Sequence, residues 1–391
     1  MGDLGATLPF CLGRHDRLAR QAAAVPGVIS FAGGLPDAAL FPKRQLGDAL
    51  GAALTSHGGS ALQYGWPEGS DELRSQVASQ LRSRGANLSK EEIVITNGAQ
   101  QALAIALSAA PRRSSVAVDQ ETYPGALDVF RAAHATLTDL QQSANVYYVM
   151  PSVSNPRGRR MSDAEKRALI ARADEHGSFI IEDDAYDGTW FSGESARPLV
   201  ADHRDRVFHV GTFSKTLCPG LRIGWLVPPP KLARRALRSK QNQDLQANGL
   251  AQALLVEYLR KGDFAAHLRR ARSRYRRKAK VLMDSVRRHL PELRFEPPRG
   301  GFSLWLESDL VLDDERLLAA AIEQGASFDL GRVFRAQPSD KLAVRLCFSA
   351  VAEAEIDEGV RRIGKALAGL WPGSRPVLGS ASLGARLPSN R

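Results

Sequence analysis

The sequence predicts an α/β protein with a mostly parallel sheet flanked by helices. Short apolar runs alternate with longer segments of helical periodicity, which is typical of parallel sheets with crossover helices. The apolar runs lie at residues 93–96, 115–119, 146–150, 179–182, 207–212 and 222–227. The helical segments lie at 100–110, 125–133, 162–176 and from 231 onward. The last apolar run follows its neighbour across a short loop, which predicts an antiparallel strand.

The C-terminal third has a different, α+β pattern, which predicts a second and smaller domain. Apolar runs at 302–306 and 343–348 alternate there with helical segments at 314–324 and 352–368. The residues after 370 are rich in Gly, Pro, Ser and Arg, a composition that cannot bury a core. We therefore expect four parts: an N-terminal segment that packs with the small domain (1–45), a large domain (46–280), a small domain (281–370) and a disordered tail (371–391).

The composition indicates a soluble enzyme in a reducing, cytoplasmic compartment. The chain has 391 residues, of which 43% are hydrophobic. No apolar run approaches the roughly 18 residues of a membrane span, and the first 20 residues lack the basic start and apolar core of a signal peptide. Cys11, Cys218 and Cys347 are far apart and odd in number, so they predict neither disulfides nor a metal site.

The net charge of +11 comes almost entirely from one segment. Residues 260–288 contain twelve Lys or Arg and two Asp, with apolar residues at helical spacing. This pattern predicts a long amphipathic helix with a solvated basic face. We therefore expect no nucleic-acid partner. The alternative, a contact with phosphate backbones, would make binding to a duplex sensitive to salt.

The most distinctive segment is residues 211–224, which read Gly-Thr-Phe-Ser-Lys-Thr-Leu-Cys-Pro-Gly-Leu-Arg-Ile-Gly. Lys215 lies there among hydroxyl groups in a loop between two apolar runs, and Arg222 follows seven residues later. The chain has only 11 lysines against 42 arginines. An amine that can lose its proton, beside groups that can hold a phosphate, indicates a Schiff-base nucleophile. The alternative is an ordinary loop lysine in solvent.

Three other segments carry polar groups where ligands commonly bind. Asp183, in Ile-Ile-Glu-Asp-Asp-Ala-Tyr, lies at the carboxyl end of an apolar strand, which is the ligand-binding edge of open α/β sheets. Residues 98–100, Gly-Ala-Gln, begin a helix after a strand, and such a turn can bind an anion. Arg345 lies in an apolar strand and needs a partner, which is either a ligand or an internal salt bridge.

These motifs, in this order, resemble the active-site segments of class I/II aminotransferases of fold type I, which use pyridoxal 5'-phosphate (PLP). The chain is most similar to the 2-aminoadipate aminotransferase group and to the catalytic domain of MocR-type regulators. Residues 29–36, Ile-Ser-Phe-Ala-Gly-Gly-Leu-Pro, resemble the N-terminal signature of that group. The resemblance extends from about residue 29 to residue 367, and implies the PLP-transferase fold of type I.

The resemblance implies chemical roles for three residues. Lys215 would hold PLP as a Schiff base and later move the α-proton of the substrate. That role requires a lowered lysine pKa, which a cationic neighbour such as Arg222 could supply. Asp183 would pair with the pyridine nitrogen, with Asp184 as the competing candidate. Tyr186 would donate a hydrogen bond to the phenolic oxygen of PLP.

The resemblance also implies the residues that bind the cofactor. Tyr123 would stack on the ring, and Asn155, in a Ser-Asn-Pro-Arg-Gly turn, would contact the phenolic oxygen. The phosphate would be bound by Gly98, Ala99, Gln100, Thr212, Ser214 and Arg222. Tyr64 would reach the phosphate of a neighbouring subunit, which implies a homodimer with shared active sites.

Substrate contacts follow from the same resemblance. Arg345 and Asn155 would bind the substrate α-carboxylate, and Gly34 would let the backbone approach it. Arg17 lies, like Arg14, where the related group has an arginine for an acidic side chain. Both are equally consistent with solvated surface charges. A basic side chain could instead meet one of two nearby acids, Asp16 and Asp37.

The expected function is a PLP-dependent transfer of an amino group from an L-α-amino acid to a 2-oxo acid, with ping-pong kinetics. The alternatives are a lyase, decarboxylase, epimerase or oxidase, because one scaffold can host several reactions at Cα. An effector-sensing module of the MocR type is disfavoured, since the residues before 29 are too few for a winged-helix domain. The segment 130–146 is shorter than is usual in the family, and only residues 135–140 could form an edge strand there.

Overall fold

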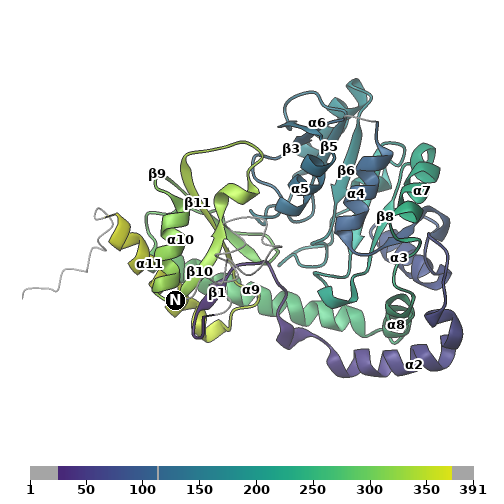
Figure 1. Cartoon of the computed structure of the whole chain (residues 1–391), viewed down its shortest axis with the longest axis horizontal. Coiled ribbons are helices and arrows are strands. Elements are labelled where there is room, and N and C mark those ends of the chain that lie inside the picture. Colours follow the sequence, from purple (N-terminus) through teal and green to yellow (C-terminus); the bar gives the residue numbers. More distant parts are fainter. Residues whose placement is uncertain (1–24, 112–113, 372–391) are drawn as a thin grey trace, which may run out of the picture.

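The computed structural model describes residues 25–111 and 114–371, to which all structural statements below refer. Its larger sheet consists of β2 (Val94–Thr96), β3 (Ser115–Val118), β4 (Thr136–Asp139), β5 (Val146–Val149), β6 (Phe179–Asp183), β7 (Val207–Thr212) and β8 (Gly224–Val227). The strand order is β2-β8-β7-β6-β5-β3-β4 (Figure 1). All neighbours are parallel except β8, which is antiparallel to β7 and β2 as predicted. The predicted edge strand is confirmed as β4.

Helices cover both faces of this sheet. They are α3 (Asp71–Ser83), α4 (Ala99–Ala109), α5 (Pro124–Ala132), α6 (Asp163–Glu175), α7 (Ala233–Asp244) and α8 (Gly249–Arg260). Successive strand residues point to opposite faces. Val146 and Tyr148 therefore pack in a cluster with α4, α5 and α7, whereas Tyr147 and Val149 pack with α3, α6 and α8. Burial on both faces explains why these strands read as continuous apolar runs.

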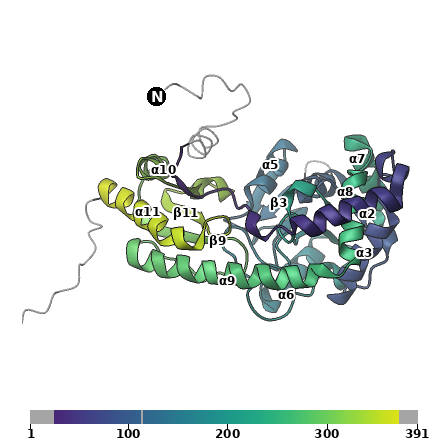
Figure 2. The same ribbon diagram turned by 90° about the horizontal axis from the view of Figure 1, so that it is seen from below.

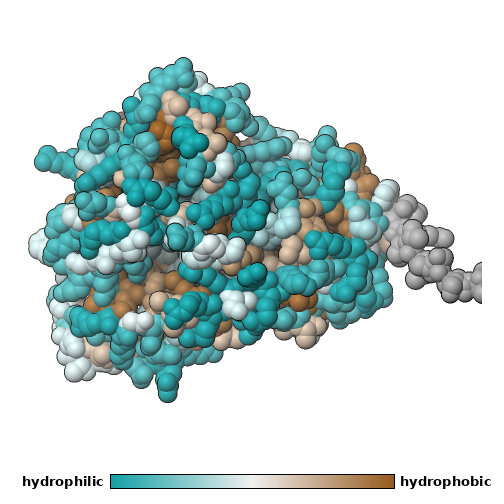
Figure 3. All heavy atoms as spheres, turned by 180° about the vertical axis from the view of Figure 1, so that it is seen from behind, coloured by the Kyte–Doolittle hydropathy of each residue, from teal (hydrophilic) through white to brown (hydrophobic). Residues whose placement is uncertain are grey.

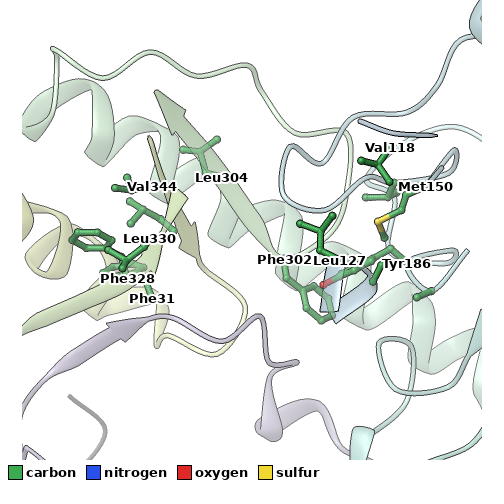
Figure 4. Packing of buried hydrophobic residues seen from close by; sticks show 14 of the residues in the cluster. Phe31, Val118, Leu127, Met150, Tyr186, Phe302, Leu304, Phe328, Leu330 and Val344 are labelled. Carbon is green, nitrogen blue, oxygen red and sulfur yellow. The ribbon is translucent and has the colours of Figure 1, made fainter. Parts of the chain in front are cut away.

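A second sheet lies beside the first. It consists of β1 (Ile29–Phe31), β9 (Ser303–Val311), β10 (Ala326–Leu330) and β11 (Lys341–Cys347), in the order β1-β10-β11-β9. Two helices, α10 (Asp314–Glu323) and α11 (Ile356–Leu370), accompany it. Figure 4 shows Phe31, Phe328, Leu330 and Val344 packed together there. The sequence predicted β9 and β11 but neither β1 nor β10.

Two long helices lie along the lower side of the molecule in Figure 1, α2 (Lys43–Leu62) and α9 (Asp263–His289). Figures 1 and 2 show α9 extending from beside α11 to beneath the larger sheet. α9 confirms the predicted amphipathic helix, with Tyr275 and Leu282 buried. One of its basic residues differs from the prediction, because Lys278 is buried and paired with Asp37. The expected domain boundaries at 46 and 281 fall inside α2 and α9, and residues 372–391 lie outside the described chain.

Short 3-10 helices complete the structure. They span Ala38–Leu40, Lys90–Glu92, Leu199–Ala201, Pro219–Leu221, Pro230–Leu232, Gly331–Phe334 and Glu353–Glu355. None of the helices within residues 25–111 and 114–371 is both long and apolar enough to cross a bilayer.

Candidate active site

A cavity of about 780 Å³ lies where the carboxyl ends of β6 and β7 face the second sheet. Most of the predicted site residues line it. They are Gly34, Ala99, Gln100, Tyr123, Asn155, Asp183, Tyr186, Thr212, Ser214, Lys215, Arg222 and Arg345. The cavity therefore brings together segments that are more than 300 residues apart in the sequence. Two of the described residues that were expected to bind the cofactor, Gly98 and Tyr64, are not in its lining.

Lys215 lies in the loop after β7, at the centre of this group. Its Nζ donates a hydrogen bond of 3.0 Å to the carbonyl oxygen of Gly34 and lies 5.5 Å from the ring centre of Tyr186. Tyr186 packs edge-on against Phe302, with ring centres 5.3 Å apart (Figure 4). Burial lowers the pKa of Lys215 to about 8, and the charge of Arg345 is the next contribution.

The predicted direction of the lysine pKa shift therefore agrees with the structure, but its main cause differs. Arg222 contributes less to the lowered pKa of Lys215 than burial or Arg345 does. An amine with a pKa near 8 is partly neutral at physiological pH, so Lys215 can act as a nucleophile and as a base.

Asp183, and not Asp184, faces the cavity at the end of β6. Its Oδ2 accepts a hydrogen bond of 2.7 Å from Tyr148 Oη, and its Oδ1 accepts one of 3.0 Å from the backbone N–H of Ala185. Burial raises the pKa of Asp183 to about 6, although the Tyr148 bond opposes this shift. Asp184 forms instead a buried ion pair with Arg84, at 2.6 Å. A cation next to Asp183 would therefore contact a carboxylate that is shielded from water.

One end of the cavity is suited to an anion. Gly98 is the N-cap of α4 with a φ of 84°, and the first N–H groups of the helix have no intrahelical acceptor. Arg222 approaches this turn so closely that a Cβ atom on Gly98 would lie 2.8 Å from its Nη2 atom. Thr212 and Ser214 add hydroxyl groups, and Thr212 Oγ1 accepts a 3.1 Å bond from the Ser214 N–H. Gly98 thus contributes through the helix start rather than as a lining residue.

A hydrogen-bond chain fixes one wall of the cavity. Tyr123 Oη donates to Gln100 Oε1 at 3.1 Å, and Gln100 Nε2 donates to the carbonyl of Gly125 at 2.7 Å. The Gln100 side chain therefore orients the tyrosine ring, while its backbone belongs to the first turn of α4.

Arg345 has an internal partner that the sequence analysis did not identify. Its Nε and Nη2 atoms donate to Asp329 Oδ2 at 3.0 and 2.7 Å, and its Nη1 donates to Asn155 Oδ1 at 2.8 Å. A Cβ atom on Gly34 would lie 3.3 Å from Arg345 Nη2, so the backbone of residue 34 closely approaches the guanidinium. The ligand and salt-bridge interpretations of Arg345 therefore coexist: it faces the cavity and is already paired.

Several candidate residues lie away from the cavity. Tyr64 is 79% exposed. Asp37 is buried between Arg274 and Lys278, at 2.6 and 2.7 Å, so it is a structural ion pair and not a lining residue. Three further candidates, Arg14, Asp16 and Arg17, lie outside the described residues.

Three residues that support the site were not predicted from the sequence. Phe302 and Tyr148 pack against or bind the predicted residues, but they read as core aromatics within apolar runs. Asp329 could have been identified from the sequence, because an acid interrupts the apolar segment 326–330.

The shape and chemistry of the cavity fit PLP. The start of α4 and Arg222 could donate to the phosphate. The buried carboxylate of Asp183 could pair with the ring nitrogen, and the amine of Lys215 could react with the aldehyde carbon. The ring of Tyr123 could stack on the pyridine.

Comparisons with known proteins agree with this assignment. The family model for aminotransferase class I and II matches residues 36–363. A 2-aminoadipate transaminase from Thermus thermophilus is 34% identical over 88% of this chain and 91% of its own. The probable rhizopine catabolism regulatory protein MocR of Rhizobium meliloti is 31% identical over 95% of this chain and 78% of its own.

A solved structure shows the same fold. The crystal structure of α-aminoadipate aminotransferase from Thermus thermophilus, complexed with N-(5'-phosphopyridoxyl)-L-leucine, has a TM-score of 0.83 and 31% identity, and the match covers 91% of this chain and 95% of that one. The chain belongs to the class I and II aminotransferases, and it is a PLP enzyme of fold type I.

Proposed function

We propose that the protein transfers the amino group of an L-α-amino acid to a 2-oxo acid by a ping-pong mechanism. The observation that carries this proposal is the position of Lys215. Its amine is buried, has a pKa lowered to about 8, and lies in one cavity with the arginine that can meet a carboxylate. A base beside a carboxylate anchor is what removal of an α-proton requires.

Bound PLP would supply an electron sink for the carbanion that forms at Cα. The protein would contribute orientation and proton transfer. Asp183 would keep the ring nitrogen protonated, Arg222 and the start of α4 would bind the phosphate, and Tyr123 would fix the plane of the ring. Lys215 would move the proton from Cα, and the ring centres of Tyr186 and Phe302 lie 5.5 and 5.8 Å from its Nζ atom.

We further propose a homodimer with shared active sites, located in the cytoplasm. The last residue of α2 and the segment that follows it expose three large apolar side chains, with exposed fractions of 68% for Leu62, 79% for Tyr64 and 76% for Trp66. Exposure on this scale favours an interface with a second copy, and Figure 3 shows apolar patches on one face of the molecule. Cys218 and Cys347 are free and buried, which agrees with a reducing compartment.

Half-reactions test the proposed reaction. The holoenzyme is mixed with one amino acid at a time, and the cofactor absorbance is followed before and after a 2-oxo acid is added. We expect the cofactor band to disappear with an amino acid and to return with the 2-oxo acid. Ammonia, carbon dioxide or peroxide formed without an acceptor would instead indicate a different reaction at Cα.

Sedimentation tests the proposed assembly. We expect a dimer, and we expect Tyr64→Phe to weaken PLP binding without changing the sedimentation coefficient. A monomer with full PLP affinity would contradict the shared site.

A further inference from the structure

Asp329 and Arg345 face each other directly across the antiparallel pair of β10 and β11. Opposite residues of such a pair project to the same face of the sheet. Both side chains are buried, and two guanidinium nitrogens of Arg345 donate to the same Asp329 oxygen at 2.7 and 3.0 Å. The backbone N–H of Gly33 donates to both Asp329 oxygens at 3.1 Å. The carboxylate is therefore held by donors from two sides.

The pairing leaves part of the guanidinium available. An arginine has five N–H donors, and the hydrogen bonds to Asp329 and Asn155 use three of them. The remaining donors lie on Nη1 and Nη2, the edge beside Gly34. A substrate carboxylate at that edge would share Nη2 with Asp329, so the two negative groups would lie roughly 5 Å apart. Like charges at that separation repel each other strongly inside a protein.

The other cations in the cavity do not compensate for this pairing. Arg131 is paired with Asp128 at 3.7 Å. Arg332 is paired with three acids, Asp313, Asp314 and Glu315. Within the described part of the chain, the cavity-lining cations without a carboxylate partner are Lys215 and Arg222. Both are assigned to the cofactor, so a substrate carboxylate meets no unmatched positive charge there.

The ion pair of Asp329 and Arg345 favours a substrate that has no carboxylate at this position. A buried arginine that loses its only anionic partner is strongly unfavourable. An arginine that depends on the substrate for that partner therefore selects against uncharged groups. Arg345 keeps Asp329 as its partner whatever the substrate carries, so an uncharged group at this position leaves no buried charge unpaired.

We propose that Asp329 is a specificity-determining residue, which keeps Arg345 neutralised and allows primary amines with an uncharged group in place of the α-carboxylate to act as amino donors. This inference rests on the proposed aminotransferase function. Amino amides and amino alcohols are the chemical class of such donors. α-Amino acids remain substrates, with a weaker preference for the carboxylate than an unpaired arginine would give.

A pair of unreactive ligands tests this inference without turnover. Calorimetry measures the binding of 3-phenylpropionate and of 3-phenylpropanamide to the holoenzyme. We expect the two dissociation constants to lie within about tenfold of each other in the wild-type enzyme. A carboxylate that binds more than about a hundredfold tighter than the amide would overturn the proposal.

The variant Asp329→Asn removes the charge and keeps the shape. We expect it to tighten 3-phenylpropionate by at least about tenfold while the affinity for the amide changes less than about threefold. Asp139→Asn is the control, because it removes one negative charge from an exposed residue that neither lines the cavity nor pairs with a cavity-lining cation. We expect the control to leave the ratio of the two affinities unchanged. An equal ratio in wild type and Asp329→Asn would contradict the proposal.

Turnover gives the second readout. We expect kcat/KM for L-phenylalaninamide to lie within about a hundredfold of that for L-phenylalanine, and this gap to widen in Asp329→Asn. The wild-type ratios need no variant, so the inference is tested even if Asp329→Asn does not fold. Absence of transamination with every donor would refute the proposed function alone, because the binding ratio is measured without turnover.

Discussion

Replacing Tyr148 with phenylalanine should make the stability of the apoenzyme depend more steeply on pH. Tyr148 Oη donates a 2.7 Å hydrogen bond to Asp183 Oδ2, and both residues are buried. A hydrogen bond to a charged group contributes about 1.5–3 kcal/mol, and one pKa unit corresponds to about 1.4 kcal/mol. Loss of this bond should therefore raise the pKa of Asp183 by about 1–2 units above its value of about 6.

The sign of the effect follows from proton linkage. The folded pKa of Asp183 lies above the unfolded value of 3.8, so the folded apoenzyme binds a proton that the unfolded chain releases. The stability that Asp183 contributes is present below about pH 4 and is lost as the pH rises through the folded pKa. This loss should amount to about 3 kcal/mol in the wild type and about 4–6 kcal/mol in Tyr148→Phe. In the variant, the pH range over which this stability is lost should extend to about pH 8.

Urea unfolding of the apoenzymes at about pH 4.5 and about pH 8.5 measures this difference. We expect the difference in the free energy of unfolding between wild type and Tyr148→Phe to grow by about 1.5–3 kcal/mol from the lower to the higher pH. Tyr147→Phe is the control: Tyr147 Oη donates to the backbone carbonyl of Gln142 at 3.2 Å, so its loss should cost about 1 kcal/mol at both pH values. A gap for Tyr148→Phe that does not change with pH would refute the reasoning.

Two further variants test the anion end of the cavity and the role of Asp184. Gly98→Ala should weaken PLP binding by at least about tenfold, because its Cβ would collide with Arg222 and because φ at this position is positive. A fluorescence titration measures this, and Gly220→Ala, which has no atom within 4 Å of its Cβ, should bind normally. Asp184→Asn should lower the free energy of unfolding by about 2–4 kcal/mol, because it removes the nearer negative charge from Arg84, whose side chain is only 9% exposed. An unchanged urea midpoint for Asp184→Asn would contradict this.

The larger sheet was predictable because burial on both faces produces a distinctive pattern. Its central strands are mostly apolar, and helical segments separate most of them, so a mostly parallel sheet with an antiparallel last strand could be predicted from the sequence. β1 was not predicted because only Phe31 of its three residues is buried, and β10 was missed because Ser327 and Asp329 interrupt its apolar pattern. Both strands depend on pairing with distant partners rather than on local preference.

The residues of the site could likewise be predicted only in part. Lys215 was predicted because it lies among hydroxyl groups in a loop between two apolar runs, and Asp183 because it lies at the carboxyl end of an apolar strand. The partner of Arg345 could not be found, because it depends on the register in which Asp329 pairs across β10 and β11. Tyr148 differs from its neighbour Tyr147 only in the face of the sheet to which it points, which the sequence of a doubly covered strand does not distinguish.

Borohydride reduction of the holoenzyme, followed by peptide mass spectrometry, tests the central claim most directly. The chain has 11 lysines, and the account predicts that the phosphopyridoxyl label is found on Lys215 and is absent from Lys215→Ala. A label on another lysine, or none after incubation with PLP, would contradict the assignment of this cavity as the active site.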